Sequence, residues 1–305
     1  MKKAIVTGAN GFIGTALCKA LSDYDVSVIA VVKDTNENID NIKNIKGLSV
    51  VYCELNQFSK LDELIEDRDV DTFYHLAWVG SAGPNRGNDE VQIDNLKYTC
   101  DTVRAAKRIN AHRFVFASSI MEFEIEALMA DIRKPSINTL YSSAKLAADY
   151  FARTIAAEIG IDYIRAVISN IYGPGEMSPR LVNTSIRKLL NKEHCSFSPG
   201  DQMYDFVYIT DAAAMFVAIG DKGISDKTYY IGSQNPRPLK EFLIELKNQV
   251  DSSAEIGLGD MEFNGIALKY NEFDIYAVKN DTGVVPKVDF SEGIRLTKEW
   301  IEGQK

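Results

Sequence analysis

The sequence predicts an α/β fold: a doubly wound parallel sheet with a smaller C-terminal α/β cap interleaved with it. Short β-rich apolar runs alternate with helical patterns through the first two thirds of the 305 residues. Apolar strands separated by helices are typical of parallel β-α-β units that are buried on both faces. A glycine-rich turn between Gly8 and Gly14 joins the first apolar run to the first helical pattern, as in many doubly wound folds.

Each main element of the first part is predicted from its own composition and periodicity. Runs rich in Val, Ile, Tyr and Phe favour strands, and these runs are Ala4–Val6, Val26–Val32, Leu48–Cys53, Thr72–Ala77, Arg113–Ser118 and Tyr163–Ser169. Apolar residues spaced three and four apart favour helices, and these segments are Ile13–Leu21, Leu61–Ile65, Gln92–Ile109 and Ser142–Ile159.

The pattern changes after Gly173-Pro174-Gly175. The predicted helices here are Arg180–Leu190, Asp211–Ile219 and Leu239–Val250, and the predicted extended segments are Asp205–Ile209 and Tyr229–Ile231. Asp251–Gly265 is weakly periodic and is predicted to be a loop. We expect two parts, residues 1–170 and residues 171–305, with the second partly interleaved with the main sheet because no linker separates them.

The composition argues against several classes of protein. With 34 basic and 43 acidic residues the net charge is −9, which disfavours nucleic acid or an anionic membrane as a partner. No apolar stretch approaches the ~20 residues of a membrane span, and the first strand begins too early for a signal peptide. The four cysteines and three histidines are scattered, so we expect reduced thiols, no metal site and a cytoplasmic protein.

Gly8, Gly11 and Gly14 predict a dinucleotide site. In this context the first glycine permits a tight turn, the second lets backbone approach a pyrophosphate, and the third lets the helix pack against the sheet. The amides of the first helical turn then face the phosphates. Residues 1–170 are therefore predicted to be a Rossmann dinucleotide-binding domain, and residues 171–305 a substrate-binding cap.

The end of the second strand bears on which dinucleotide binds. NAD-binding domains usually carry an acidic residue there, which binds the ribose 2′-hydroxyl, whereas Val32 and Lys33 stand near that position here. Because Lys33 can pair with a 2′-phosphate, the sequence favours NADP(H). Asp34 keeps NAD(H) open, and Lys33 is equally compatible with a solvated strand end.

Tyr141 and Lys145 predict a catalytic pair. Of the 14 tyrosines, only Tyr141 is followed by a lysine four residues later, a spacing that puts both side chains on one helix face. A neighbouring ammonium favours the phenolate and lowers the phenol pKa, which suits proton transfer at neutral pH. Ser119, at the end of a predicted strand, can orient a substrate oxygen. Ordinary helix residues and a helix cap are the alternative interpretation.

Further motifs follow in a fixed order. They are His75-Leu76-Ala77-Trp78, Asn95, Ser118-Ser119, Asn170-Ile171-Tyr172-Gly173-Pro174-Gly175, and Asp205-Phe206-Val207-Tyr208-Ile209. With the glycine turn and Tyr141/Lys145, the chain resembles the NAD-dependent epimerase/dehydratase family of extended short-chain dehydrogenases/reductases, which modify nucleotide-linked sugars. The resemblance covers nearly the whole chain.

The resemblance implies roles for particular residues. The catalytic residues would be Ser119, Tyr141 and Lys145. The cofactor would contact Tyr141 and Lys145 and also Gly8, Asn10, Gly11, Phe12, Ile13, Gly14, Lys33, Glu54, Leu55, Leu76, Ala77, Trp78 and Asn95. The substrate would contact Ser119, Asn170 and Tyr204.

The chain departs from the family pattern at three places. Ile120-Met121 stand where the dehydratases carry Asp-Glu, so we expect no sugar 4,6-dehydratase. Tyr204 replaces an arginine that usually contacts the nucleotide diphosphate; Arg180 and Arg187 are possible substitutes or surface charges. Trp78 replaces a small residue near the nicotinamide, where it either narrows the pocket or packs in the core.

Four functions remain open. The favoured one is NADP(H)-dependent reduction of a nucleotide-linked 4-keto sugar, with Tyr141 as general acid/base. The alternatives are a nucleotide-sugar 4-epimerase with tightly bound NAD and a non-catalytic cofactor-binding regulator, and reduction of a non-sugar ketone is also possible. The resemblance further implies a homodimer through Gln92–Ile109 and Ser142–Ile159, whose apolar residues could equally face their own sheet.

Overall fold

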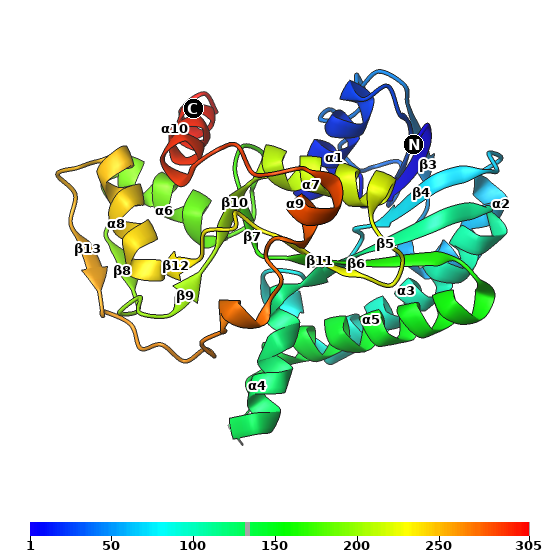
Figure 1. Ribbon diagram of the computed structural model, residues 1–305. Helices are drawn as coiled ribbons and strands as arrows, with labels where there is room; N and C mark the ends of the chain where they lie inside the picture. Colours follow the sequence, from blue (N-terminus) through cyan, green and yellow to red (C-terminus); the bar gives the residue numbers. More distant parts are fainter. Residues whose placement is uncertain (132–134, 305) are drawn as a thin grey trace.

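The computed structural model describes residues 1–131 and 135–304. Its centre is a seven-stranded sheet in the order β11-β6-β5-β4-β1-β2-β3, in which every neighbouring pair is parallel (Figure 1). The strands are β1 (Lys3–Thr7), β2 (Ser27–Val32), β3 (Leu48–Tyr52), β4 (Val70–His75), β5 (Ala111–Ser119), β6 (Asp162–Ile168) and β11 (Thr228–Ile231). The predicted doubly wound parallel sheet is confirmed.

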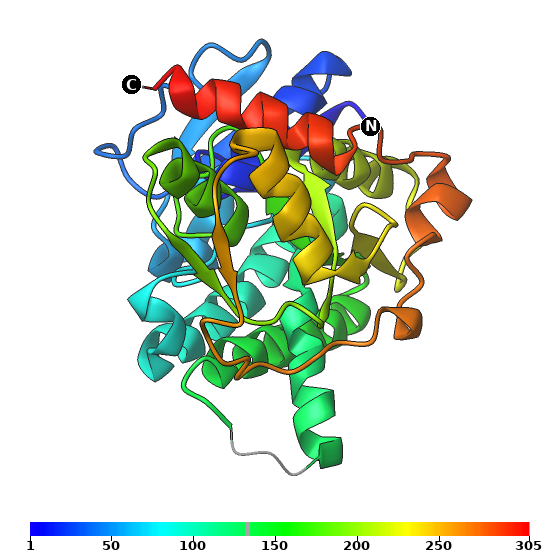
Figure 2. The same ribbon diagram turned by 90° about the vertical axis from the view of Figure 1, so that its left-hand side faces the viewer.

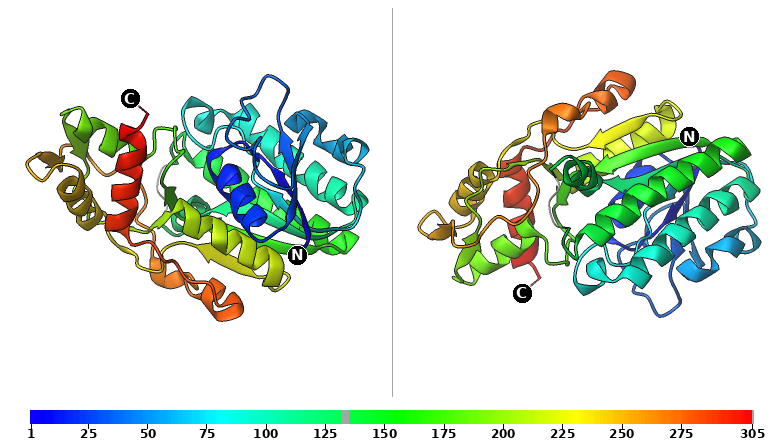
Figure 3. Two further views of the ribbon diagram at one scale, coloured as in Figure 1. Left: turned by 90° about the horizontal axis from the view of Figure 1, so that it is seen from above. Right: turned by 90° about the horizontal axis from the view of Figure 1, so that it is seen from below.

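Helices cover both faces of this sheet. Two helices, α1 (Phe12–Asp23) and α7 (Ile209–Lys222), lie on one face, and α3 (Asp89–Arg108) and α5 (Thr139–Ile159) lie on the other (Figures 1 and 3). The alternation along β1 matches these layers, since Ala4 and Val6 join one buried cluster and Ile5 joins the other. The shorter helical elements of the first 131 residues are η1 (Leu55–Lys60), α2 (Leu61–Leu64), η2 (Pro84–Gly87), η3 (Ile120–Glu122) and α4 (Phe123–Asp131).

A smaller α/β part lies beside the carboxyl ends of the strands (Figure 3). Its two-stranded sheets pair β10 (Phe206–Tyr208) with β7 (Asn170–Tyr172), β12 (Arg237–Pro238) with β9 (Met203–Tyr204), and β13 (Ile256–Leu258) with β8 (Cys195–Phe197). Its helices are α6 (Leu181–Leu190), α8 (Leu239–Val250) and α10 (Phe290–Glu302). Between α8 and α10 in the sequence lie η4 (Tyr270–Glu272) and α9 (Ala277–Thr282), and α9 packs on α7 and β11 of the main sheet. Helix α10 packs across α8 (Figure 2).

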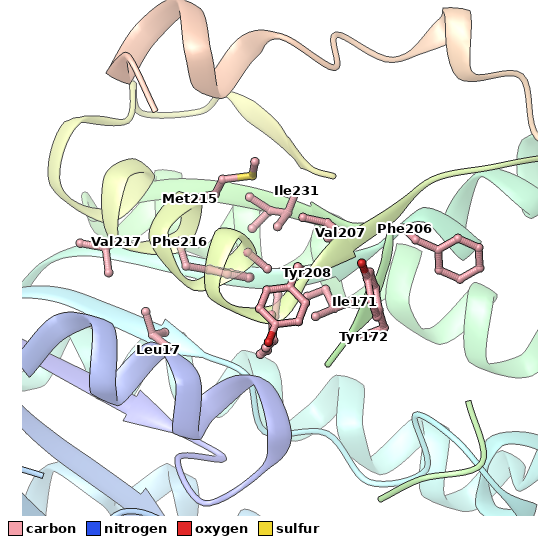
Figure 4. Close-up of a cluster of buried hydrophobic side chains, with 14 of the residues drawn as sticks. Leu17, Ile171, Tyr172, Phe206, Val207, Tyr208, Met215, Phe216, Val217 and Ile231 are labelled. Carbon is pink, nitrogen blue, oxygen red and sulfur yellow. The ribbon is translucent and has the colours of Figure 1, made fainter. Parts of the chain in front are cut away.

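The two parts share one apolar core. Leu17 of α1, Phe216 of α7, Tyr172 of β7 and Phe206 of β10 belong to the same buried cluster (Figure 4). The outermost strand of the main sheet, β11, comes from the C-terminal half of the sequence and pairs with β6. After β7 to β10 in the smaller part, the chain therefore adds one more strand, β11, to the main sheet.

Two local predictions differ from the structure. Asp251–Gly265 was expected to be a loop, but it contains β13, which pairs with β8. A three-residue strand has too few residues to show a periodicity, and its partner alone defines it. Helix α4 was not predicted; the hydrophobic residues of its Phe123–Asp131 segment do not gather on one face, so it lacks the amphipathic pattern on which a helix prediction depends.

Candidate active site

The glycine turn connects β1 to α1 at the carboxyl edge of the sheet. Gly8 has φ +68°, and a Cβ there would lie 3.0 Å from the amide nitrogen of Ala77. A Cβ on Gly14 would lie 2.1 Å from the carbonyl oxygen of Gly8. Only glycine fits these two positions, which brings the turn against both the start of α1 and the end of β4. Helix α1 begins at Phe12, and its N-cap residue, Gly11, provides no side-chain hydrogen bond, so the first amides of the helix remain available to an anion.

Thr7 ties the turn to the neighbouring strand end. Its hydroxyl oxygen accepts hydrogen bonds from the amides of Leu76 and Ala77, each at 3.2 Å, and lies 3.0 Å from His75 Nδ1. Burial lowers the pKa of His75 to about 3, with Lys145 acting in the same direction. The imidazole is therefore neutral and serves as a fixed hydrogen-bonding group between β1 and β4.

One cavity of about 370 Å³ collects most of the predicted site residues. Ser119 comes from the end of β5, and Tyr141 and Lys145 come from the first turns of α5; all three side chains are buried. The predicted residues that line it together are Gly8, Asn10, Gly11, Phe12, Ile13, Gly14, Leu76, Ala77, Trp78, Ser119, Tyr141 and Lys145. The glycine turn and Ser119, Tyr141 and Lys145 therefore line the same cavity, although Gly14 and Ser119 are 105 residues apart in the sequence.

Other predicted site residues lie outside this cavity. Lys33 follows β2 and is exposed, with its ammonium 3.9 Å from the Asp34 carboxylate. Glu54 and Leu55 stand at the start of η1, where Leu55 packs against the buried cluster under α3. Asn95 is buried in α3, and its side chain bonds both the amide and the carbonyl of Val79 at 3.0 and 2.8 Å, so it holds the loop after β4.

The two remaining predicted substrate residues lie in the smaller part. Asn170 begins β7, and its side-chain amide donates to the carbonyl oxygen of Asp205 at 3.1 Å. Tyr204 ends β9, and its ring stacks on Phe206 with centroids 5.6 Å apart. Neither is among the residues that line the cavity around Tyr141.

Tyr141 lies between a serine and a cation. Ser119 and Tyr141 line the same cavity, and the Arg86 guanidinium lies 4.0 Å from the Tyr141 ring centroid. Burial raises the pKa of Tyr141, while the Ser119 hydrogen bond and then the charges of Arg86 and Arg180 act to lower it. The expectation of a phenol pKa below its usual value is therefore wrong, because desolvation outweighs the nearby cations.

Lys145 is enclosed by aromatic rings and backbone. Its ammonium donates to the carbonyl oxygen of Ala117 at 2.8 Å and lies 3.7 Å from the centroid of the Trp78 ring. Burial lowers the pKa of Lys145 to about 7, and the charge of Glu122 opposes this shift. The ammonium is thus turned toward β5 and Trp78, and the cations that lower the Tyr141 pKa are Arg86 and Arg180.

Trp78 both lines the cavity and packs in the core. Its ring meets that of Tyr141 edge to face at 6.1 Å, and its Nε1 donates to Gln92 Oε1 at 3.1 Å. The indole also packs against the apolar cluster under α3. Both interpretations of this departure from the family pattern therefore hold at once, and the bulky ring narrows the space beside Lys145.

Sequence reasoning missed Arg86 and left open whether Arg180 and Arg187 reach the site. Arg86 lies in η2, within a Gly/Pro-rich stretch that predicts only a turn, and it donates to the Ser81 carbonyl at 2.9 Å. Burial lowers the pKa of Arg86. Arg180 lines the cavity and pairs with Glu176 at 3.1 Å. Arg187 donates to the Glu176 carbonyl at 3.0 Å instead of facing the cavity. Arg86 comes close to Tyr141 through the course of the loop after β4, which no local sequence pattern predicts.

Within the described ranges, 1–131 and 135–304, there is no group of three or more His, Cys, Asp or Glu side chains that could hold a metal ion. The four cysteines are free and buried. In the same part of the chain, none of the helices combines the length and apolar character that crossing a membrane requires.

The chain is similar to named proteins over nearly its whole length. The chain is 28% identical over 319 residues to a putative UDP-glucose 4-epimerase of Methanocaldococcus jannaschii, covering 98% of each protein. It is 24% identical over 304 residues to CDP-abequose synthase of Salmonella typhimurium, covering 95% of each.

Solved structures share the fold over the full length. A UDP-N-acetylglucosamine 4-epimerase from Methanobrevibacter ruminantium, in complex with UDP-N-acetylmuramic acid, superposes with a TM-score of 0.80 at 22% identity, covering 100% of this chain and 99% of that one. The UDP-glucuronic acid 4-epimerase from Bacillus cereus, in complex with UDP-glucuronic acid and NAD, gives 0.78 at 20% identity, covering 99% and 100%. The model of the NAD dependent epimerase/dehydratase family matches residues 4–232, and the chain therefore belongs to this family of enzymes, of the extended short-chain dehydrogenase/reductase type.

Proposed function

We propose that the protein transfers hydride to or from C4 of a nucleotide-linked sugar with a nicotinamide dinucleotide as cofactor. The observation that carries the proposal is the meeting of Ser119, Tyr141 and Lys145 with the glycine turn around one cavity. Residues 1–170 would bind the dinucleotide, and residues 171–305 would form the substrate cap while completing the sheet through β11.

The residues of the turn fit a dinucleotide pyrophosphate. Gly8 and Gly14 leave no room for a Cβ, and the uncapped start of α1 offers amides to phosphate oxygens. In this cavity the cofactor would contact Gly8, Asn10, Gly11, Phe12, Ile13, Gly14, Leu76, Ala77 and Trp78. Its adenosine part would lie near Lys33, Glu54, Leu55 and Asn95. When bound, it would supply the hydride donor or acceptor.

Tyr141 would exchange the proton of the substrate oxygen. Its raised pKa keeps the phenol protonated at neutral pH, so it can donate to a carbonyl oxygen. The charges of Arg86 and Arg180 then stabilise the phenolate that remains. Ser119, which lines the same cavity as Tyr141, would orient the oxygen that receives the proton. Lys145, Asn170 and Tyr204 would position the cofactor and the substrate.

The 4-epimerase form is the first candidate. Proteins named as UDP-sugar 4-epimerases share the fold of this chain over its full length, and one of them holds NAD. NAD is accordingly the first cofactor to test. The second candidate is an NADP(H)-dependent 4-keto reductase, which the exposed ammonium of Lys33 at the end of β2 favours.

Elimination of water is not proposed. Ile120 and Met121 form η3 next to Ser119 and bring no acid to the cavity. Glu122 follows them, but its carboxylate is bound by Ser118, by the Ser119 amide and by Arg165. It does not line the cavity.

The test begins with the nucleotide that purifies with the protein. Extraction and chromatography would identify NAD or NADP, and incubation with UDP-glucose, UDP-N-acetylglucosamine and UDP-glucuronic acid would reveal 4-epimers. NADPH consumption with 4-keto nucleotide sugars tests the second candidate. Tyr141→Phe should lower kcat about 100-fold or more, and Tyr276→Phe, an exposed tyrosine, should not. Full activity of Tyr141→Phe would remove the proposed proton donor.

A homodimer is proposed through the outer faces of α3 and α5. Ile93, Tyr150 and Phe151 on these helices are exposed, at 66%, 61% and 56%. Val103 on α3 is instead fully buried against its own sheet. The exposed apolar side chains support pairing of two copies, since large exposed patches of this kind mark interaction surfaces.

A further inference from the structure

A buried carboxylate lies directly behind Ser119. One oxygen of Glu122 accepts hydrogen bonds from the Ser118 hydroxyl at 2.5 Å and from the Ser119 amide at 3.1 Å. The other oxygen pairs with Arg165. The Ser119 hydroxyl in turn accepts from the Met121 amide at 3.2 Å, which closes a reciprocal cap. Glu122 therefore joins η3 to the end of β5 through the backbone of Ser119 and the side chain of Ser118.

Ion pairs and hydrogen bonds connect Glu122 to α5, the helix that carries Tyr141 and Lys145. Arg165 on β6 lies 3.2 Å from the Ser118 hydroxyl and 3.4 Å from the Asp149 carboxylate. Asp149 accepts from the Tyr163 hydroxyl at 2.8 Å. It stands four residues after Lys145 and eight after Tyr141, on the same face of α5. The chain of contacts thus links the end of β5, η3, β6 and α5.

Stability alone is a poor reason for such a group. Burying two carboxylates and one guanidinium costs desolvation energy, and apolar replacements of buried ion pairs are often neutral or stabilising. A fully hydrogen-bonded network does define one geometry. Here that geometry is the position of Ser119 relative to the Tyr141 phenol.

We propose that Glu122, supported by Arg165 and Asp149, is a positioning residue that holds the end of β5 so that Ser119 faces the cavity beside Tyr141, and that its negative charge favours the charged form of Lys145. The proposal rests on the function proposed above, because it assigns Glu122 a part in that same site.

The electrostatic surroundings agree with this geometry. The Lys145 ammonium contacts the Ala117 carbonyl and the Trp78 ring, and the titratable groups coupled to it electrostatically are Glu122 of η3 and His75 of β4, of which His75 is neutral at this site. Burial lowers the pKa of Lys145, and Glu122 opposes it. Burial raises the pKa of Glu122, while Arg165 and Ser118 lower it and Asp149 raises it. Removing the Glu122 charge should therefore leave Lys145 uncharged over more of the neutral range.

The test is Glu122→Gln, which keeps an acceptor for the Ser119 amide but removes the charge. We expect kcat to fall, and we expect the alkaline limb of both kcat and dinucleotide affinity to move about one pH unit lower. Affinity is measured by fluorescence titration with NADH from pH 6 to 9. The control is Asp62→Asn, which breaks a pair with Arg108 (2.7 Å) far from the cavity and should change neither profile.

Ser118→Ala separates geometry from charge and serves if Glu122→Gln does not fold. It removes the hydroxyl that Glu122 and Arg165 both contact but leaves the charge, so kcat should fall while the pH limb stays in place. An equal loss at every pH in Glu122→Gln, or an unchanged kcat in Ser118→Ala, would overturn the inference. A wild-type protein that binds no dinucleotide at all would instead overturn the proposed function.

Discussion

Lys145→Met should stabilise the cofactor-free protein, and the gain should shrink as the pH rises. The buried ammonium makes a hydrogen bond to the Ala117 carbonyl and lies against Trp78. Burial lowers its pKa from 10.5 to about 7. Between these values the unfolded chain holds a proton that the folded protein has released, so the free energy of unfolding of the wild type rises with pH. Methionine carries no such proton.

The magnitude follows from the two values. One pKa unit corresponds to about 1.36 kcal/mol. Between pH 7 and pH 9 the wild type should therefore gain about 2 kcal/mol in free energy of unfolding relative to the variant. At pH 7 the variant should be the more stable protein, since it has no ammonium to desolvate and loses about 1 kcal/mol with the hydrogen bond to Ala117.

Urea unfolding followed by circular dichroism at pH 7, 8 and 9, with a reductant present, measures the difference. Lys60→Met changes an exposed lysine of η1 and should give a difference from the wild type that does not vary with pH. A constant difference for Lys145→Met over the same range would refute the reasoning, because it would mean that Lys145 keeps its proton like a solvated lysine.

Three further predictions concern other parts of the site. Gly14→Ala places a Cβ 2.1 Å from the Gly8 carbonyl, so NADH affinity in a fluorescence titration should fall about tenfold or more; an unchanged affinity would contradict the close approach, which overpacking makes costly. Arg86→Gln removes a charge that lowers the Tyr141 pKa and would stabilise the phenolate left after proton donation, so kcat at pH 7 should fall about tenfold; an unchanged kcat would assign Arg86 to packing. Phe151→Asp puts a charge on the exposed face of α5 and should yield a monomer by light scattering; a dimer of unchanged mass would place the interface elsewhere.

The main elements could be predicted because each carries its own signal. The strand predicted at Val26–Val32 is observed at Ser27–Val32, and the helix predicted at Leu239–Val250 has those bounds. Parallel strands are apolar on both faces, and amphipathic helices repeat every three to four residues, so a short window of sequence suffices. Strand β13 and helix α4 lack such a window, and their contacts with the rest of the chain define them.

Much of the site could also be predicted, for a different reason. The glycine turn and the Tyr141/Lys145 spacing are local patterns, and each has a physical meaning within a few residues. Arg86 and Glu122 have none. Arg86 reaches Tyr141 across 55 residues of sequence, and Glu122 becomes a partner of Arg165 only because β5 and β6 are neighbours in the sheet.

By itself the sequence determined the order of strands and helices, the family and the identity of the residues that could carry proton transfer. The tertiary structure decided their electrostatics. A pKa depends on the water and charge around a group, and both are set by segments far apart in the chain. Burial therefore raises the pKa of Tyr141, although the neighbouring Lys145 had suggested a lower pKa. The charges that act to lower this pKa come from Arg86 and Arg180, which the fold brings near Tyr141.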